Sequence, residues 1–174
     1  MLGAKLSKHI KSIVFDLDGT IYSGNKLIDG AKEIIKYLED KGYSIFYFTN
    51  NSSRNKLQLT EKLAKLGLPV SYDKVYCSLD ATPLFLNEKK LKTVFCCGSH
   101  ELINALIANS FNVFQKDNIE ILFDAVVVGM NINFSYEVLS QASLALQRNA
   151  QCKLIACNLD ASYPVENGYR MPGC

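Results

Sequence analysis

The stretch Ser12-Ile13-Val14-Phe15-Asp16-Leu17-Asp18-Gly19-Thr20 decides the fold of this chain. Its first four residues form a short, mostly apolar run with two β-branched residues, which is typical of a buried strand in a parallel sheet. Two aspartates follow the run directly, and open α/β sheets bind ligands where their strands end. We therefore expect a strand that delivers Asp16 and Asp18 to the carboxyl edge of a sheet.

Asp16 and Asp18 are suited to phosphoryl transfer with Mg²⁺. Residues two apart in an extended segment point to the same side, so the two carboxylates can share one ligand. Mg²⁺ takes few carboxylates together with water and phosphate oxygens. A carboxylate can also attack phosphorus, while a second acid protonates the leaving group. Asp16 fits the nucleophile and Asp18 the acid/base, and Gly19 allows the chain to turn away; an acidic turn that merely ends the strand is the structural alternative.

A second set of polar residues follows the next predicted strand. Tyr43 to Phe48 is an apolar and aromatic run, and Thr49-Asn50-Asn51-Ser52-Ser53 comes directly after it. The Thr49 hydroxyl and the backbone N–H groups from Asn50 onward would lie at the same sheet edge as the aspartates, where they can bind phosphate. Capping of the following helix by a serine of this stretch, Ser52 or Ser53, is an alternative that does not compete.

The order of the elements predicts two α/β units. Strands at 12–15, 43–48 and 74–77 alternate with helices that end at Gly42 and Gly67, which predicts a doubly wound, Rossmann-like parallel sheet with right-handed crossovers. The pattern restarts near residue 82, so we expect domains at 1–81 and 82–174, with Pro83 at the boundary. The second unit is expected to contain strands at 93–97, 111–114, 124–129 and 153–157 and helices at 99–109 and 135–148.

Composition narrows the partners and the location. The chain has 174 residues, 48% apolar and 21% charged, with a net charge of +2, which provides no broad field for nucleic acid or an anionic membrane. No apolar run approaches the roughly 20 residues of a membrane span, and residues 1–11 carry lysines without a following apolar stretch. We therefore predict a cytoplasmic protein. The six cysteines lack metal-ligand or C-x-x-C spacing and are predicted to be free thiols.

Together these residues resemble the haloacid dehalogenase superfamily of hydrolases. Asp16-Leu17-Asp18-Gly19-Thr20 matches its first motif, and Thr49-Asn50 matches its second. Further features are similar to the branch that holds para-nitrophenyl phosphatases, phosphoglycolate phosphatase and pyridoxal phosphate phosphatase: Ile21-Tyr22, Val128-Gly129-Met130, Asn158-Leu159-Asp160 and Tyr163-Pro164. The resemblance implies a Rossmann-like core with an α/β cap inserted after the second motif, which would be the unit from residue 82.

The resemblance also implies an activity and a set of roles. It implies an Mg²⁺-dependent phosphatase that acts through an aspartyl-phosphate on a small phosphorylated metabolite, with Asp16 and Asp18 as metal ligands. Thr49 and Asn50 would bind the phosphate. Asp160 lies in a loop expected to face the active site and is a candidate specificity residue, while a turn built by Asn158 and Asp160 is the alternative. Caps in this branch often mediate dimers, so the cap is a candidate surface for a homodimer, although the sequence does not determine the oligomeric state; nucleic acid and membrane partners are not expected.

Some residues of the superfamily pattern have no counterpart in these 174 residues. The superfamily carries, after the cap, a lysine that balances the phosphate and nucleophile charges, and then a Gly-Asp segment with acids that hold the metal. The core is therefore expected to be incomplete, and the second hypothesis is a catalytically deficient, truncated fragment that acts, if at all, as a binding or assembly module. A response-regulator-like phosphoacceptor domain is the third, although its acceptor would be expected on a later strand.

Overall fold

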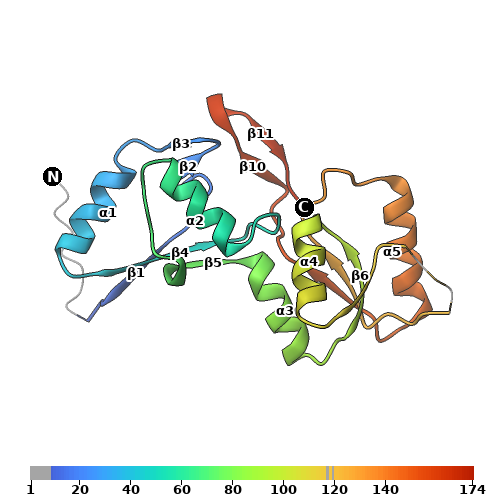
Figure 1. Cartoon of the computed structure of the whole chain (residues 1–174). Helices are drawn as coiled ribbons and strands as arrows, with labels where there is room; N and C mark the ends of the chain where they lie inside the picture. Colours follow the sequence, from blue (N-terminus) through green and yellow to red (C-terminus); the bar gives the residue numbers. More distant parts are fainter. Residues whose placement is uncertain (1–8, 117, 119) are drawn as a thin grey trace.

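The computed structural model describes residues 9–116, 118 and 120–174, so most of the N-terminal stretch 1–11 considered for a leader lies outside the described residues. Two parallel β-sheets stand beside each other, each with its own helices (Figure 1). The α/β architecture with parallel sheets is confirmed. Within the described part of the chain, no helix has both the length and the apolar character needed to cross a bilayer.

The first sheet has the strand order β1-β4-β5, with β1 at Ser12–Phe15, β4 at Ser44–Thr49 and β5 at Val75–Cys77. Helices α1 (Ala31–Asp40) and α2 (Lys56–Lys65) connect the strands. Both connections step in the same direction, so right-handed crossovers place both helices on one face. Winding in this sheet is thus in one direction only, and the covered face forms part of the main core.

The helix ends of the first sheet follow local signals. Gly42 has a φ of +85°, a left-handed conformation that glycine adopts without strain and that ends α1. The cap of α2 is Asn55, whose side chain accepts from the backbone of Gln58 in a capping box. The alternative that Ser52 or Ser53 caps this helix is therefore wrong, because the loop after β4 runs on before the helix begins.

In the part of the chain that the structure describes, no element covers the other face of the first sheet. Val14, Phe48 and Tyr76 are 53%, 50% and 43% exposed there, and the rings of Phe48 and Tyr76 lie 4.8 Å apart. Parallel sheets are normally buried on both faces. Strand β1, which carries Asp16 at its end, is also an edge strand.

The second sheet has the order β7-β6-β8-β9 and is wound in both directions. Helices α4 and α5 lie on its opposite faces (Figure 1). Alternate residues of β6 serve the two sides, since Val94 and Cys96 belong to the core with α4, and Phe95 and Cys97 to the core with α5. The bounds are β6 Thr93–Cys97, α4 His100–Ala108, β7 Asn112–Phe114, β8 Ala125–Val128, α5 Tyr136–Arg148 and β9 Lys153–Ala156.

Helix α3 (Ser78–Glu88) crosses the predicted domain boundary and is not predicted from the sequence. Pro83 was expected to mark a break, because proline inside a helix removes a hydrogen bond, yet the helix continues through it. Leu79 and Leu86 are buried in a core that also contains Leu63 of α2 and Leu102 of α4. The two units therefore share an apolar core, and their division at 81/82 stays a prediction.

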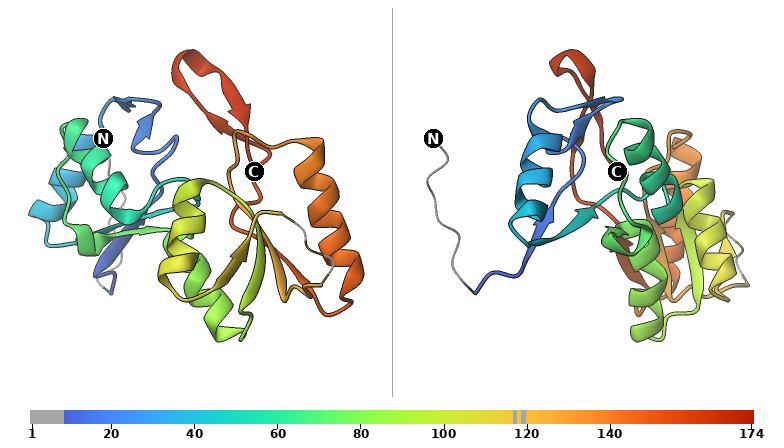
Figure 2. Two further views of the ribbon diagram at one scale, coloured as in Figure 1. Left: turned by 45° about the vertical axis from the view of Figure 1, so that its right-hand side comes forward. Right: turned by 60° about the vertical axis from the view of Figure 1, so that its left-hand side comes forward.

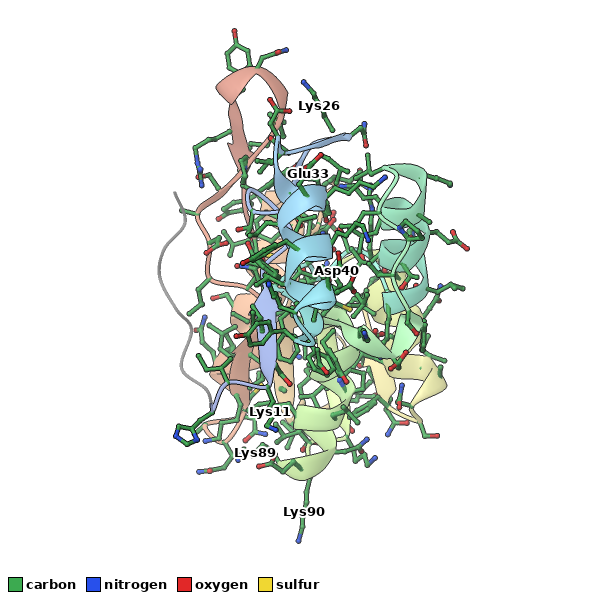
Figure 3. All side chains as sticks on the ribbon, turned by 90° about the vertical axis from the view of Figure 1, so that its left-hand side faces the viewer. Lys11, Lys26, Glu33, Asp40, Lys89 and Lys90 are labelled. Atoms are coloured by element: carbon green, nitrogen blue, oxygen red, sulfur yellow. The ribbon has the colours of Figure 1, made fainter. Side chains whose placement is uncertain are left out.

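Two short hairpins, also absent from the prediction, close one end of the molecule. They are β2–β3 (Tyr22–Ser23 and Lys26–Leu27) and β10–β11 (Ser162–Pro164 and Arg170–Pro172). The Ser23 hydroxyl donates to the carbonyl of Val165, 3.2 Å away, and so joins them. Figure 3 shows Lys26 at this end and Lys89 and Lys90, which follow α3, at the other. Single 3₁₀ turns lie at Tyr72–Lys74 and Glu166–Gly168.

The six cysteines are free, as predicted. Burial raises the pKa of Cys96 to about 12 and that of Cys97 to about 11. These two thiols therefore stay protonated at neutral pH and act as small core residues.

Candidate active site

Asp16 and Asp18 point together into a cleft of about 890 Å³. Leu17, between them, is fully buried, so the two carboxylates take the opposite side of the chain from the core. Gly19 then turns the chain with a φ of +86°, and its N–H donates to the Tyr22 carbonyl at 2.7 Å. The first motif thus places two acids at the carboxyl end of β1, side by side.

The environment of Asp16 disfavours its negative charge. Burial raises the pKa of this carboxyl, and the negative charges of Asp18 and Asp160 raise it further, against a lowering by the Leu17 N–H. The Thr20 hydroxyl donates to Asp16 Oδ2 from 3.5 Å. A carboxylate in this position is stabilised by a cation, which is what a metal-dependent nucleophile requires.

Asp18 is held by two hydroxyl groups. Tyr22 donates to Asp18 Oδ2 at 3.0 Å, and Thr49 donates to the same oxygen at 3.5 Å. The Tyr22 side chain is fully buried, and burial raises its pKa, so it remains a donor. Its role at Asp18 is not predicted from the sequence, although its position four residues after Asp18, across a tight turn, could have indicated it.

Thr49 and Asn50 lie at the end of β4, the strand next to β1, and so reach the same edge as the aspartates. The Thr49 side chain is buried and faces Asp18, as described. Asn50 uses its amide nitrogen differently, donating to Asn158 Oδ1 at 3.2 Å and to Asp160 Oδ2 at 2.7 Å. Because a carboxylate can only accept, the nitrogen of this amide must face Asp160. In this arrangement the Asn50 side chain does not donate to a phosphate, whereas its backbone N–H belongs to the loop at the cleft.

Asp160 lies at the cleft as well as in a turn. Its backbone N–H donates to Asn158 Oδ1 at 2.7 Å, which is the local turn geometry considered as the alternative. Its carboxylate meets Asn50, and both residues line the cleft. The loop that follows β9 is thereby tied to the end of β4.

Ser52 is a buried residue of the site. The sequence predicts it only as a cap of the following helix, and that prediction is wrong because Asn55 caps α2. The hydroxyl of Ser52 accepts from the Met130 N–H at 2.8 Å, and its carbonyl accepts from the Ser99 hydroxyl at 3.4 Å. A Cβ at Gly129 would lie 3.3 Å from the Ser52 hydroxyl, so glycine permits the close approach. The loop after β4 thus enters the second sheet where β6 and β8 end, at its topological switch point. Figure 2 shows the two units side by side, with β10–β11 rising between them.

The donor set fits a hard cation such as Mg²⁺. No group of three or more His, Cys, Asp or Glu side chains in residues 9–116, 118 and 120–174 is placed to hold a metal ion. Asp16 and Asp18 nevertheless offer two carboxylates to one cleft, and Mg²⁺ in phosphoryl-transfer sites is bound by one or two carboxylates with water and phosphate oxygens.

Several known proteins are similar to this chain. An acid sugar phosphatase from Staphylococcus epidermidis is 36% identical over 167 residues, which are 95% of this chain and 62% of that protein. The structure of a p-nitrophenyl phosphatase from Archaeoglobus fulgidus is 32% identical with a TM-score of 0.76, over 93% of this chain and 59% of that one. A glycerol phosphate phosphatase from Mycobacterium tuberculosis, in complex with magnesium, is 27% identical with a TM-score of 0.77, over 93% and 47%. The chain thus spans less than two thirds of the length of these relatives.

The family itself follows from a more direct match. A model of the haloacid dehalogenase-like hydrolases matches residues 13–112, more than half of the chain. This range contains all of β1 but its first residue, both aspartates, β4 and the loop after it, the elements that bring Asp16, Asp18 and Thr49 together. The chain therefore belongs to the haloacid dehalogenase-like hydrolases.

Proposed function

We propose that the cleft hydrolyses small phosphate monoesters, with Asp16 as the nucleophile and Asp18 as the acid/base. The observation that carries this proposal is that Asp16 and Asp18 open into one cleft from the end of β1, while Thr49, at the end of the neighbouring parallel strand, donates a hydrogen bond to Asp18. The names of the relatives, an acid sugar phosphatase, a p-nitrophenyl phosphatase and a glycerol phosphate phosphatase, support the same reaction class.

The proposed reaction has two steps. A carboxylate oxygen of Asp16 attacks phosphorus, the bond from phosphorus to the ester oxygen breaks, and Asp18 protonates the departing alkoxide. Water then attacks the phosphorus of the aspartyl-phosphate while Asp18 takes its proton. The bond to Asp16 breaks, and inorganic phosphate leaves.

The surroundings of the two acids suit these roles. Tyr22 and Thr49 donate to one oxygen of Asp18, which leaves its other oxygen for proton transfer. Asp16 and Asp18 would hold Mg²⁺, which supplies positive charge against the nucleophile and the phosphate. The magnesium complex of the Mycobacterium tuberculosis enzyme supports this choice of metal. Thr49, the backbone at Asn50 and the Asp160 loop would contact the substrate.

One observation favours a second function. The uncovered face around Val14, Phe48 and Tyr76 is suited to assembly, as a module that binds without turnover would require. A homodimer through the second unit and a cytoplasmic location stay predictions.

Trapping of the intermediate tests the proposed function. The polypeptide is incubated with Mg²⁺ and acetyl phosphate, quenched in acid, and its peptides are examined by mass spectrometry for a phosphoryl group. We expect the adduct on Asp16, none in Asp16→Asn, and a longer-lived adduct in Asp18→Asn, because the second step lacks its base. An adduct on Asp18, or turnover that persists in Asp16→Asn, would overturn the assignment.

A further inference from the structure

Arg54 and Lys62 form a positively charged wall on one side of the cleft. Arg54 lies exposed in the loop before α2, and Lys62 lies half-buried within α2. In the described part of the chain neither side chain is paired with a carboxylate. Two cations that have no ion-pair partner in the described part of the chain thus border a cleft that contains the proposed nucleophile.

Packing holds Lys62 in this wall. Its ammonium lies 3.6 Å from the centroid of the Tyr22 ring, a cation–π contact. The pKa of Lys62 is lowered, chiefly by burial. The negative charge of Asp18 raises this pKa in part, and the positive charge of Arg54 lowers it further. An anion that binds beside a partly desolvated ammonium without an ion-pair partner stabilises the charged form of that ammonium.

Tyr22 places this wall on the side of the leaving group. The hydroxyl of Tyr22 contacts Asp18, while its ring lies under Lys62. Since Asp18 protonates the leaving alkoxide in the proposed reaction, the alcohol portion of the substrate lies on the same side as the two cations. The phosphate lies at Asp16.

The charges on the other sides of the cleft also favour binding of an anionic group at Arg54 and Lys62. Glu101 and Asp160 line the cleft from the second unit and would repel an anion there. A groove continuous with the cleft extends past Arg54 and Lys62, and in it Lys65 offsets Glu61. An anionic group on the alcohol portion is therefore directed to Arg54 and Lys62.

We infer that the cleft selects phosphate esters whose alcohol portion carries a second anionic group, bound by Arg54 and Lys62. The planar guanidinium suits the two oxygens of a carboxylate or a second phosphate. This inference rests on the proposed function and specifies its substrate class.

Binding of matched phosphonates tests the inference without requiring turnover. Titration calorimetry of the 174-residue polypeptide with Mg²⁺ compares phosphonoacetate, 3-phosphonopropionate and 4-phosphonobutyrate with the corresponding amides, which have the same size and lack the carboxylate. We expect at least one acid to bind on the order of 10-fold more tightly than its amide. A bisphosphonate of matching length shows whether a second phosphate replaces the carboxylate.

Variants assign the effect to the two cations. Arg54→Gln and Lys62→Met should each reduce the preference for the acid while leaving the affinity for the amide unchanged. Lys36→Gln, at a residue of α1 that does not line the cleft, removes the same charge and should preserve the preference. Equal binding of every acid and its amide, or loss of both ligands in Arg54→Gln, would overturn the inference while the phosphate site stands. Absence of binding by all the phosphonates would instead contradict the proposed function, and the inference with it.

Discussion

The amide nitrogen of Asn50 lies 2.7 Å from a carboxylate oxygen of Asp160, 110 residues further along the chain. Asn50 directly follows β4, and Asp160 belongs to the loop that leaves the second sheet after β9. This hydrogen bond ties the second motif of the sequence to the segment that precedes β10–β11.

We expect the Asn50–Asp160 contact to be worth about 0.5–1.5 kcal/mol, because both side chains are exposed and the bond is charge-assisted. Urea unfolding of Asn50→Ala, Asp160→Ala and the double variant measures this as a coupling energy. Asp160→Asn, which retains an acceptor, should keep part of it. If the changes in unfolding free energy of the two single variants add up to that of the double variant to within about 0.3 kcal/mol, the contact has no energetic role.

Asp16→Asn should abolish turnover and retain the fold, because an amide is a poor nucleophile and metal ligand.

Asp16→Asn should also stabilise the metal-free protein at pH 7. The pKa of Asp16 is raised, so the folded state prefers the protonated acid, and ionisation at neutral pH opposes folding. The gain should shrink as the pH falls through the raised pKa and vanish below the ordinary value of 3.8. Thermal melts across this range check the sign, and an Asp16→Asn variant that melts below the native protein at pH 7 would contradict it.

Asp18→Asn should be severely impaired in the same assays, since the amide can neither protonate the alkoxide nor take a proton from water. Tyr22→Phe is the matched control, because it leaves the carboxylate and removes only the hydrogen bond that holds it. Its loss of activity should therefore be the smaller of the two. Activity of Asp18→Asn near that of the native protein would remove Asp18 from the proposed role.

Turnover should require Mg²⁺, be suppressed by chelation and be poorly supported by Ca²⁺, whose looser coordination does not maintain in-line geometry. A polypeptide of residues 1–174 should hydrolyse p-nitrophenyl phosphate far more slowly than about 1–10 per second, an ordinary range for enzymes. Among the described residues no cation is ion-paired with Asp16 or Asp18, and each charge-stabilising donor that a phosphate site lacks can cost about 100- to 1000-fold. Rates in the ordinary range, or equal rates with Ca²⁺, measured on monodisperse protein, would contradict this prediction.

The uncovered sheet face should make the 174-residue polypeptide self-associate, because Val14, Phe48 and Tyr76 leave apolar area beside the unpaired edge of β1. Sedimentation velocity over a range of concentrations measures the association. Phe48→Thr should weaken it, since threonine keeps the strand preference and removes the ring. Ile132→Thr, at a residue that is more exposed but lies outside this sheet, is the control. A monomer at all concentrations would contradict the prediction.

Ser52→Ala should destabilise the fold by about 1–3 kcal/mol, because the Met130 N–H would lose its partner in a buried place. Ser53→Ala, in the neighbouring half-buried position, is the control and should have a smaller effect. Unfolding free energies of the two variants make the comparison. Equal losses would show that Ser52 does not join the two sheets.

Local patterns were sufficient for the strands of the two parallel sheets, the helices at 31–40 and 56–65 and the placement of the two aspartates, but not for the two hairpins. Apolar period, glycine at helix ends and alternation along a strand depend on near neighbours, so Asp16 and Asp18 could be assigned to one side of the chain from their spacing alone. Helix α3 was not predicted, because Pro83 is a local signal for a break in a helix. Burial of Leu79 and Leu86 outweighs that signal.

The partners of the site residues depended on how the loops at the ends of the two sheets meet. Ser52 and Met130 are 78 residues apart and Asn50 and Asp160 are 110 apart, and no periodic pattern relates positions so distant. The same packing brings Lys62 over Tyr22 and leaves Phe48 without a covering layer. These contacts arise only when separate segments bury apolar area together, which is a property of the whole chain and is not encoded in any one stretch of it.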